Sequence, residues 1–447
     1  MKKVALVLML VGGGIPTLVH ASKIEQLRHV PTTYVDPAKG HLPFNIHRGT
    51  QTLLSLMLPG THFNDPEGVA CSLLDFQKSF RHPSQDVVIT VVGVNSGAGQ
   101  ILYNVGLSAI KKFGSLGEGV DQFRAPQGIA ITHQGRIAVA DAGNNRIVLL
   151  QHNQYRIFWV KALGHLGTHR GEFRFPSGVA FDGSGRLFIT DTLNNRIQIL
   201  LPNGKFVVFP AQGLIHPTGI AIIDKKDVWT FYRSGPWADR IAVIDDNGQR
   251  IQIFNFSGQR LYAITASQIT SRPSKFIACA FDYYGNLVVT NELQSCLMKF
   301  SPTLKFLTSF YGDAQEGNQL NQPRGIAINK QFGQVIVSEK KCVDYLWVGA
   351  DAQHIRLIYH KPSQYTIRFF LTDPAIISVQ IINSEHQTEA VLANHRVLNE
   401  GEHQLNWKLT PFIASGIYHL QLKVMATYSS RDRIQKIIRR SFRVSQN

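Results

Sequence analysis

The chain is poor in acidic residues and carries few charges of either sign. Its 447 residues include 30 Asp and Glu against 46 Lys and Arg, which gives a formal net charge of +16. A basic excess of this size favours partners with acidic surfaces or polyanions. Charged residues make up only 17% of the chain and hydrophobic residues 44%, a balance typical of a folded, β-rich protein.

The sequence also lacks the usual signals of catalysis and of disulfide frameworks. It contains no glycine-rich phosphate loop, no Gly-x-Ser-x-Gly elbow and no His-Glu-x-x-His motif. Four cysteines are too few for a dense disulfide scaffold, and their spacing fits no metal motif. We expect most of the four to be buried thiols, with Cys296 and Cys342 as the pair to consider first for a disulfide.

Apolar runs long enough to cross a bilayer are missing as well. The N-terminus has Lys2 and Lys3, an apolar run over Val4–Val11 and a small-residue cleavage site that ends at Ala21. This pattern predicts a bacterial secretory signal peptide over residues 1–21 and an exported mature chain in the periplasm, at the cell surface or in the medium. Cleavage removes two lysines, so the net charge falls from +16 to +14.

What the sequence does have is a repeat. The stretch DAGNNRIVLL begins at Asp141, and DTLNNRIQIL begins at Asp191. Each belongs to a longer unit with a Pro-x-Gly element, two short apolar runs separated by a turn with glycine, an Asp and then an Arg-Ile run. The clearest copies are FRAPQGIAITHQGRIAVADAGNNRIVLL from Phe123 and FRFPSGVAFDGSGRLFITDTLNNRIQIL from Phe173.

Four weaker copies extend the repeat in both directions. The residues at the Asp position of the six copies are Asn95, Asp141, Asp191, Asp245, Asn291 and Ser338. Successive copies are therefore spaced by roughly 46–54 residues, the length of one propeller blade of four short strands. No amphipathic helical pattern of comparable length interrupts them. Six copies predict six blades.

The recurring Asp and Arg residues allow two interpretations. A carboxylate and a guanidinium five residues apart could serve a chemical site, or a turn that recurs at a fixed period could mark one unit of a repeat fold. We favour the second: the Asp would accept hydrogen bonds in a tight turn, the Asn would adopt a left-handed backbone, and the Arg stem would pack along a neighbouring blade. These repeat markers are Asp141, Arg146, Asp191, Arg196, Asp245 and Arg250.

These residues resemble the NHL repeat, which has the same Pro-x-Gly-Ile-Ala and Asp-x-x-Asn-x-Arg-Ile elements and which forms six-bladed propellers. The resemblance covers roughly residues 63–350. We therefore expect an all-β chain with an NHL-type propeller over residues 22–361. A ring must close, so we predict that Thr50–Gly60 is the outermost strand of the last blade and pairs near Tyr345–Ala350.

After Lys361 the repeat stops and the pattern changes to strand-like alternation. The stretches TIRFFL, ISVQII, GEHQLNW and ASGIYHLQL resemble the Ig-like domain of the flagellar hook-cap protein. We expect a small Ig-like β-sandwich over residues 362–447, with Trp407 in its core. The resemblance implies an anchoring, spacing or secretion-sorting role.

Ligands of propellers bind at the mouth of the central channel, so the residue after each repeat proline is a candidate for ligand binding. The candidates are Glu67, Gln127, Ser177, Thr218, Ser274 and Arg324. Propeller lyases that cut amidated peptide precursors hold zinc with histidines at this position, and gluconolactonase-type propellers hold a divalent ion with several carboxylates. Here no candidate is histidine and only Glu67 is acidic, which is too few ligands for a catalytic metal. The alternative for this ring is solvated channel lining, with Glu67 and Arg324 paired across the first and last blades.

A second candidate surface is the loop with His165, His169 and Arg170, which we expect to be exposed and to add to a basic face. The function that the sequence favours is non-catalytic binding of a protein or of an acidic polysaccharide or lipopolysaccharide by a monomer. Export argues against a nucleic acid, and no cofactor or metal is implied. The alternative is a metal-dependent hydrolase or lyase at the channel mouth. Envelope scaffolding alone is a third possibility.

Overall fold

The computed structural model describes most of the chain after its N-terminal region. The described residues are 33–34, 48–75, 89–105, 109–226, 238–310, 312–313, 318–330, 333–361, 363–410, 412–427 and 435–445. The predicted signal peptide lies outside these ranges. Within them, no helix combines the length and the apolar character that a membrane span requires.

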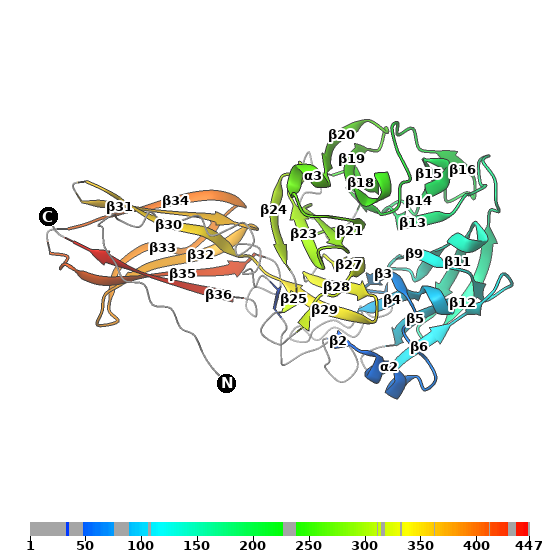
Figure 1. Cartoon of the computed structure of the whole chain (residues 1–447), viewed down its shortest axis with the longest axis horizontal. Coiled ribbons are helices and arrows are strands. Elements are labelled where there is room, and N and C mark those ends of the chain that lie inside the picture. Colours follow the sequence, from blue (N-terminus) through cyan, green and yellow to red (C-terminus); the bar gives the residue numbers. More distant parts are fainter. Residues whose placement is uncertain are drawn as a thin grey trace, which may run out of the picture.

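Six antiparallel sheets are arranged around a common centre (Figure 1). From the inner to the outer edge, the first three blades are β3 (Pro66–Ser72), β4 (Thr90–Asn95), β5 (Gln100–Val105) and β6 (Ala109–Phe113); β9 (Pro126–Ile131), β10 (Arg136–Asp141), β11 (Arg146–His152) and β12 (Ile157–Leu163); and β13 (Pro176–Phe181), β14 (Leu187–Asp191), β15 (Arg196–Leu200) and β16 (Phe206–Val208). The next two are β17 (Ile220–Ile223), β18 (Arg240–Asp245), β19 (Arg250–Asn255) and β20 (Arg260–Thr265); and β21 (Phe276–Phe281), β22 (Leu287–Asn291), β23 (Cys296–Phe300) and β24 (Phe306–Phe310).

The sixth blade combines both ends of the propeller. It contains β27 (Pro323–Asn329), β28 (Gln334–Glu339) and β29 (Cys342–Val348), and β29 also pairs with β1 (Thr33–Tyr34) and β2 (Arg48–Gly49). The inner strands contact one another in sequence, and β27 contacts β3, which closes the ring. The predicted six-bladed propeller is confirmed.

Short elements complete the propeller. Two pairs of two-residue strands are among them: β7 (Ser115–Leu116) pairs with β8 (Gln122–Phe123), and β25 (Gly312–Asp313) pairs with β26 (Asn318–Gln319). Short helices and 3-10 turns are α2 (Gln51–Met57), α3 (Ala266–Ile269), η3 (Ser96–Ala98), η4 (Ala142–Asn144), η5 (Thr192–Asn194) and η6 (Asp246–Gly248).

The hydrophobic cores lie between neighbouring blades. One core joins Val92 and Ile101 of the first blade to Ile137 and Val148 of the second. Each sheet is thus covered on both faces, which explains why its strands read as continuous apolar runs. In β10, for example, every residue after the first is buried.

The predicted closure by Thr50–Gly60 is wrong in its details. Gln51–Met57 is a helix, and the pairing with β29 is made by the two-residue strands that precede it. Thr50 caps this helix, because its side chain accepts a hydrogen bond from the Leu53 N–H. A short apolar run cannot be assigned to strand or helix from its periodicity alone. The N-terminal region does close the ring, but through other residues.

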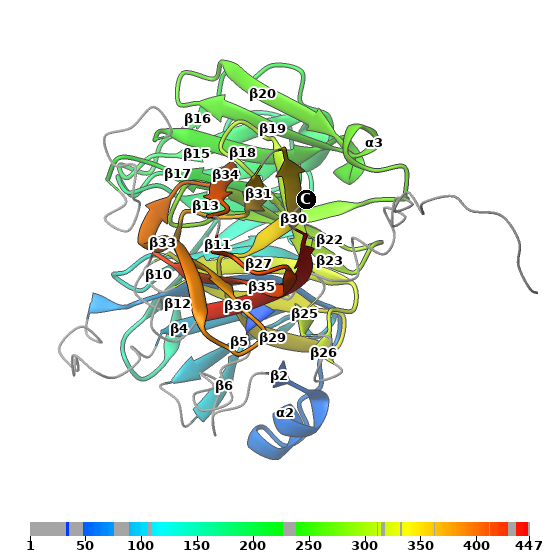
Figure 2. The same ribbon diagram turned by 90° about the vertical axis from the view of Figure 1, so that its left-hand side faces the viewer.

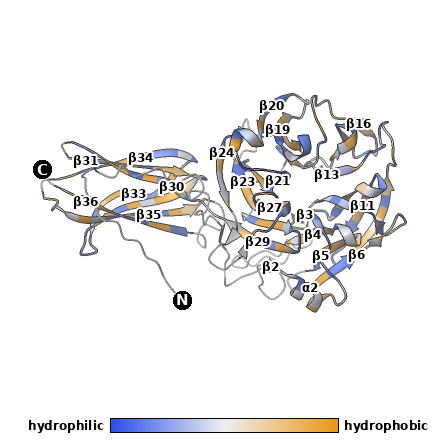
Figure 3. Ribbon diagram, viewed as in Figure 1, coloured by the Kyte–Doolittle hydropathy of each residue, from blue (hydrophilic) through white to orange (hydrophobic). Residues whose placement is uncertain are grey.

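The C-terminal part is a sandwich of two sheets beside the propeller (Figures 1 and 2). One sheet has the order β30 (Ala352–His360), β31 (Gln364–Leu371), β34 (Gly401–Lys408). The other has the order β33 (Thr388–Leu398), β32 (Ala375–Ile382), β35 (Gly416–Ala426), β36 (Gln435–Val444). Buried and partly exposed residues alternate along β32. Figure 3 shows that the strands of the sandwich carry both hydrophobic and hydrophilic residues.

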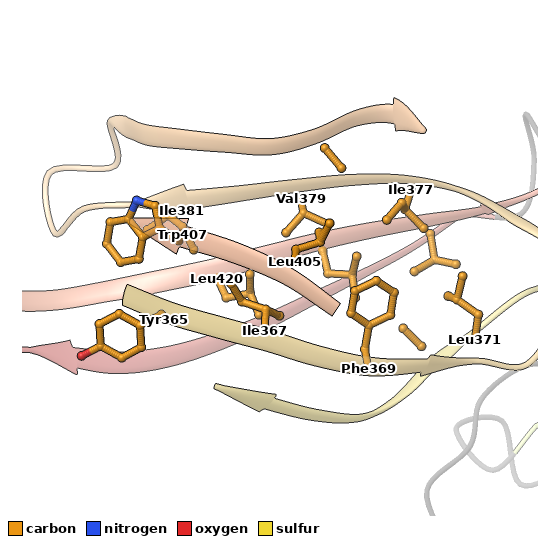
Figure 4. Packing of buried hydrophobic residues seen from close by; sticks show 14 of the residues in the cluster. Tyr365, Ile367, Phe369, Leu371, Ile377, Val379, Ile381, Leu405, Trp407 and Leu420 are labelled. Carbon is orange, nitrogen blue, oxygen red and sulfur yellow. The ribbon is translucent and has the colours of Figure 1, made fainter. Parts of the chain in front are cut away.

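The sandwich core lies between the two sheets, and Figure 4 shows its central side chains. Trp407 is 4% exposed, so the prediction that it is a core residue is confirmed. It stacks on Tyr365 at a ring-centroid distance of 5.8 Å. Strand β30 lies before the predicted boundary at residues 361/362 but pairs with β31, so it belongs to the sandwich.

A buried ion cluster joins the two domains. Lys299 of β23 contacts Asp373 of the sandwich and lies 2.8 Å from Asp282 Oδ2. Burial lowers the pKa of Lys299, but the two carboxylates outweigh this effect and raise it above its ordinary value. A second contact is a 3.0 Å hydrogen bond from Gln353 Nε2 to Thr308 Oγ1.

The four cysteines are thiols, so Cys296 and Cys342 are not joined by a disulfide. Both are buried, and they lie in β23 and β29 of neighbouring blades. Burial raises the pKa of Cys71 and of Cys279 to about 12, as expected for buried thiols.

Candidate functional site: the mouth of the propeller channel

The repeat markers hold the loops that cross from one blade to the next. Asp191 is fully buried, and its Oδ1 accepts a 2.7 Å hydrogen bond from the backbone N–H of Arg174 in the incoming loop. Arg196 pairs with Asp191 Oδ2 at 2.7 Å and donates to the carbonyl oxygens of Thr168 and His169 at 2.5 and 2.7 Å. The marker pair therefore fastens the crossing loop onto its blade.

The same arrangement recurs in the neighbouring blades. Arg146 lies 2.7 Å from Asp141, and Arg250 lies 2.6 Å from Asp245. Asn145 has a left-handed backbone, as predicted, and its Oδ1 accepts a hydrogen bond from the next blade. The Asp, however, accepts a backbone N–H of the crossing loop rather than of the turn, and from the turn it accepts only the side chain of the Asn three residues later. The Arg head binds the carbonyl groups of the same loop.

The marker of the sixth blade is Glu339, not Ser338 as the sequence suggested. Glu339 pairs with Pro323 as Asp141 pairs with Pro126, and it accepts the loop N–H of Asn321 at 3.0 Å. Ser338 instead donates to the carbonyl of Glu67 in the first blade and accepts from Gly325 N–H. Because the sixth copy lacks an Asp, only strand pairing reveals its register.

The glycines of Pro-x-Gly allow the inner strands to meet closely around the channel. A Cβ atom would lie 2.4 Å from the Ser177 carbonyl oxygen at Gly128, and 2.2 Å from the Thr218 oxygen at Gly178. At Gly325 it would lie 2.5 Å from the Glu67 oxygen, where the last blade meets the first. The residue before each glycine is therefore held at the channel wall.

The ring position of the fifth blade is Ile277 rather than Ser274. Phe276 pairs with Asn291 as the repeat proline pairs with the marker in other blades. The oxygen of Ile277 lies 2.7 Å from a Cβ placed on Gly219, which is the contact that a ring residue makes. Pro273 is not in the register of the other repeat prolines, so counting from it misplaced the candidate by three residues.

A cavity of about 470 Å³ occupies the channel mouth. Five of the six predicted ring residues line it: Glu67, Gln127, Ser177, Thr218 and Arg324. Its apolar lining comes from the inner strands, for example Val69, Val179 and Ile326. The cavity thus brings together residues that are far apart in sequence; Glu67 and Arg324, for example, are 257 positions apart.

The charged side of the cavity is centred on Arg324. Its Nη1 contacts Glu67 and lies 2.7 Å from Asp65 Oδ1, and its Nε lies 3.4 Å from Glu292 Oε1. Lys275 Nζ lies 2.9 Å from Glu292 Oε2. The suggested pairing of Glu67 with Arg324 across the first and last blades is present, and two further carboxylates join it.

Burial raises the pKa of Glu67 to about 7. Arg324 opposes this effect by favouring the ionised form, whereas the negative charges of Asp65 and Glu292 add to it. A carboxyl group that titrates near neutrality in a cavity is a candidate for ligand binding or proton transfer.

Sequence reasoning missed Glu292 and Lys275. Glu292 directly follows the marker position at Asn291, and Thr192, which occupies the same place after Asp191, also lines the cavity. The residue after the marker therefore reaches the cavity in the third and fifth blades. That offset was readable in the repeat alignment, but nothing in it indicated that the side chain reaches the channel.

We use the name apolar rim for exposed hydrophobic residues at the mouth end of the blades. They lie in the crossing loops and in the turns that follow the markers: Leu116, Leu166, Phe175, Leu193, Ile215 and Leu293. Phe175 also lines the cavity. Their exposed fractions range from 37% for Phe175 to 63% for Leu166. Because the marker contacts hold these loops at the mouth end of the blades, the rim and the cavity share one face.

The predicted basic loop lies outside the cavity lining. His165 and His169 are exposed and both face Glu172, at 3.5 and 3.0 Å. Arg170 is exposed in the same loop. The loop does not join the ring residues in one site.

One group of three metal-donor side chains occurs in the described part of the chain, and it is not in the cavity lining. It consists of Glu339, Cys342 and Asp344 in the sixth blade, with donor atoms within 4.8 Å of one another. The Cys342 thiol donates to Glu339 Oε2 at 3.2 Å. In the cavity, the carboxylates of Glu67 and Glu292 face Arg324 instead.

Comparison with protein-family models identifies the NHL repeat at residues 123–148 and 173–200. The chain contains NHL repeats. This match confirms the two copies predicted from Phe123 and Phe173. A search of curated proteins gave no match.

Solved structures of similar fold include propeller enzymes. A gluconolactonase from Xanthomonas campestris is 13% identical, with 69% of this chain and 97% of that chain covered and a TM-score of 0.44. A virginiamycin B lyase from Staphylococcus aureus is 18% identical, with 58% and 76% covered and a TM-score of 0.40. A protein of unknown function from Bacteroides thetaiotaomicron is 14% identical, with 69% and 74% covered and a TM-score of 0.46. These similarities are too distant to indicate an activity for this chain.

Proposed function

We propose that the propeller is a non-catalytic binding module whose channel mouth captures a segment of a protein partner. The observation that carries this proposal is the combination of an open cavity of about 470 Å³ with an apolar rim on one face. Ligand sites of proteins commonly have volumes of about 300–1,000 Å³. Exposed apolar residues around a polar centre are typical of protein interaction sites.

Of the two ligand classes expected from the sequence, the geometry favours a protein over a polyanion. Six of the basic side chains at the mouth already pair with carboxylates: Arg124, Arg146, Arg196, Arg250, Lys275 and Arg324. An acidic polysaccharide would have to displace these partners. Apolar rim residues, in contrast, gain free energy when a protein surface covers them.

The sandwich is proposed to anchor or space an exported propeller. Its ion cluster reaches Asp282, which follows β21, at the end of the blade opposite to the mouth. This position leaves the cavity accessible. Fractionation of the producing cells, with the whole chain and with a chain that lacks residues 1–21, tests the export; retention of both forms in the cytoplasm would contradict it.

Peptide-library selection tests the binding site. Peptides selected on the immobilised protein are titrated against Gln127→Trp, which fills the cavity, and against Gln134→Trp, in the exposed turn at the other end of the same blade. We expect affinity to fall by at least about tenfold, or 1.4 kcal/mol, in the first variant and to stay unchanged in the second. Equal affinity for both variants would place binding elsewhere. Selective binding of alginate, with no selected peptide, would favour the polyanion.

Glu67 supports the alternative, an enzyme at the same mouth. A carboxyl group with a pKa of about 7 beside a guanidinium could serve as a general acid or base in a hydrolase or lyase. Assay against a panel of lactones and peptides, with metal analysis of the purified protein, tests this function. Turnover that Glu67→Gln abolishes, together with a stoichiometric divalent ion, would replace the binding proposal with the metal-dependent enzyme.

A further inference from the structure

The charge of the cluster around Arg324 in the cavity is opposite to that of the chain as a whole. Three carboxylates, those of Asp65, Glu67 and Glu292, face the cationic groups of Arg324 and Lys275. With all five ionised, the cluster carries one excess negative charge. The distant basic residues contribute little here, because the screening length at physiological salt is about 8 Å.

The opposite wall of the cavity supplies no compensating cation. It presents Gln127, Ser177 and Thr218 of the second, third and fourth blades. Thr192 donates to Ser177 Oγ at 2.7 Å, so this part of the wall is already hydrogen-bonded. An incoming group is therefore selected by the charged side.

An anion and a cation would meet this charged side very differently. Arg324 already faces three carboxylates, so an anion that approached its guanidinium would meet their repulsion. A carboxylate can accept several hydrogen bonds. Glu67 can therefore bind a further donor beside Arg324, and Glu292 can bind one beside Arg324 and Lys275. An added cation would also neutralise the excess charge.

We propose that the group inserted into the channel mouth is the guanidinium or ammonium of a basic side chain, so that the partner presents an Arg or Lys within an otherwise apolar segment. This inference rests on the proposed binding function and names its ligand class. The apolar rim would cover the flanking residues, and Glu67 and Glu292 would receive the cationic nitrogen. The specificity is thus for basic peptides, although the protein itself is basic.

Glu67 makes this recognition dependent on pH. The charged groups that face it are Arg324, Asp65 and Glu292, with Lys275 behind Glu292. Its pKa of about 7, which burial raises, leaves it mostly protonated at pH 6 and mostly ionised at pH 8. Because only the ionised form attracts a cation, affinity for a basic peptide is expected to rise by up to about tenfold between these pH values.

The test uses three peptides with the same apolar flanks and a central arginine, citrulline or glutamate. Citrulline keeps the shape of arginine without its charge. We expect the arginine peptide to bind the wild-type protein at least about tenfold more tightly than the citrulline peptide at pH 8. Glu292→Gln should reduce that ratio about tenfold. Glu118→Gln, whose exposed carboxylate pairs with Arg124 outside the cavity lining, should leave it unchanged.

The outcomes separate this inference from the function on which it rests. Equal binding of all three peptides, lost in Gln127→Trp, would retain the site and overturn its preference for cations. Tighter binding of the glutamate peptide would reverse the inferred sign. No binding of any peptide, by the wild-type protein or by Glu67→Gln, would overturn both proposals.

Discussion

Replacing Arg196 with alanine should destabilise the propeller more than the same replacement of an exposed arginine would. The substitution removes the 2.7 Å pair with Asp191 and the hydrogen bonds to the carbonyl groups of Thr168, His169 and Glu172. Asp191 would remain fully buried, with a charge that the arginine no longer balances. The loop would lose its main attachment to the third blade.

The magnitude follows from these contacts. Removing one partner of a buried ion pair costs about 3–5 kcal/mol. Asp191 keeps hydrogen bonds from Arg174 N–H, Asn194 and Gln198, and the Arg196 side chain is 18% exposed, so water can reach the freed groups. We therefore expect a loss of about 2–4 kcal/mol in unfolding free energy. With an unfolding entropy of about 2.1 cal/mol/K per residue over roughly 300 residues, Tm should fall by about 3–6 °C.

Differential scanning calorimetry of the wild-type protein, Arg196→Ala and Arg170→Ala measures this effect. Arg170 lies exposed in the same loop and serves as the control. A Tm within about 1 °C of the control would refute the structural role of the marker. So would an Arg196→Ala protein that keeps its Tm but loses peptide binding, since the marker would then belong to the binding site.

Three further predictions concern the channel wall, the junction and the cysteines. Gly178→Ala should lower the free energy of unfolding by about 1–3 kcal/mol, because its Cβ would lie 2.2 Å from the Thr218 oxygen. Gly416→Ala is the control, and it should leave calorimetric stability unchanged because the space around Gly416 is open. Lys299→Met should destabilise the junction by about 3–5 kcal/mol, because the buried Asp373 and the partly buried Asp282 lose their shared cation. Limited proteolysis should then separate the domains, and unchanged resistance would contradict this. All four cysteines should react with a thiol reagent in denaturant at pH 8 and resist it in the native state; two reactive thiols after denaturation would instead indicate a disulfide.

Much of the propeller could be predicted from the sequence because each blade is a local unit. The elements of one repeat lie within about 50 residues, and each forms a turn, a strand or the attachment of a loop within that span. Asp141 and Arg146 recur at Asp191 and Arg196 because every crossing loop needs the same attachment. Register was less certain in copies without an Asp, where Ser338 was chosen instead of Glu339.

The sequence by itself determined the number of blades, the two clearest repeats, the core position of Trp407 and the ring residues of five blades. The tertiary structure alone decided which N-terminal residues close the ring, which residue of the fifth blade faces the channel, and how Glu67, Glu292 and Arg324 meet. The physical reason is range. A repeat pattern records contacts within a blade. Ring closure brings together side chains from the first, fifth and sixth blades, and the ion pairs between them do not recur along the sequence.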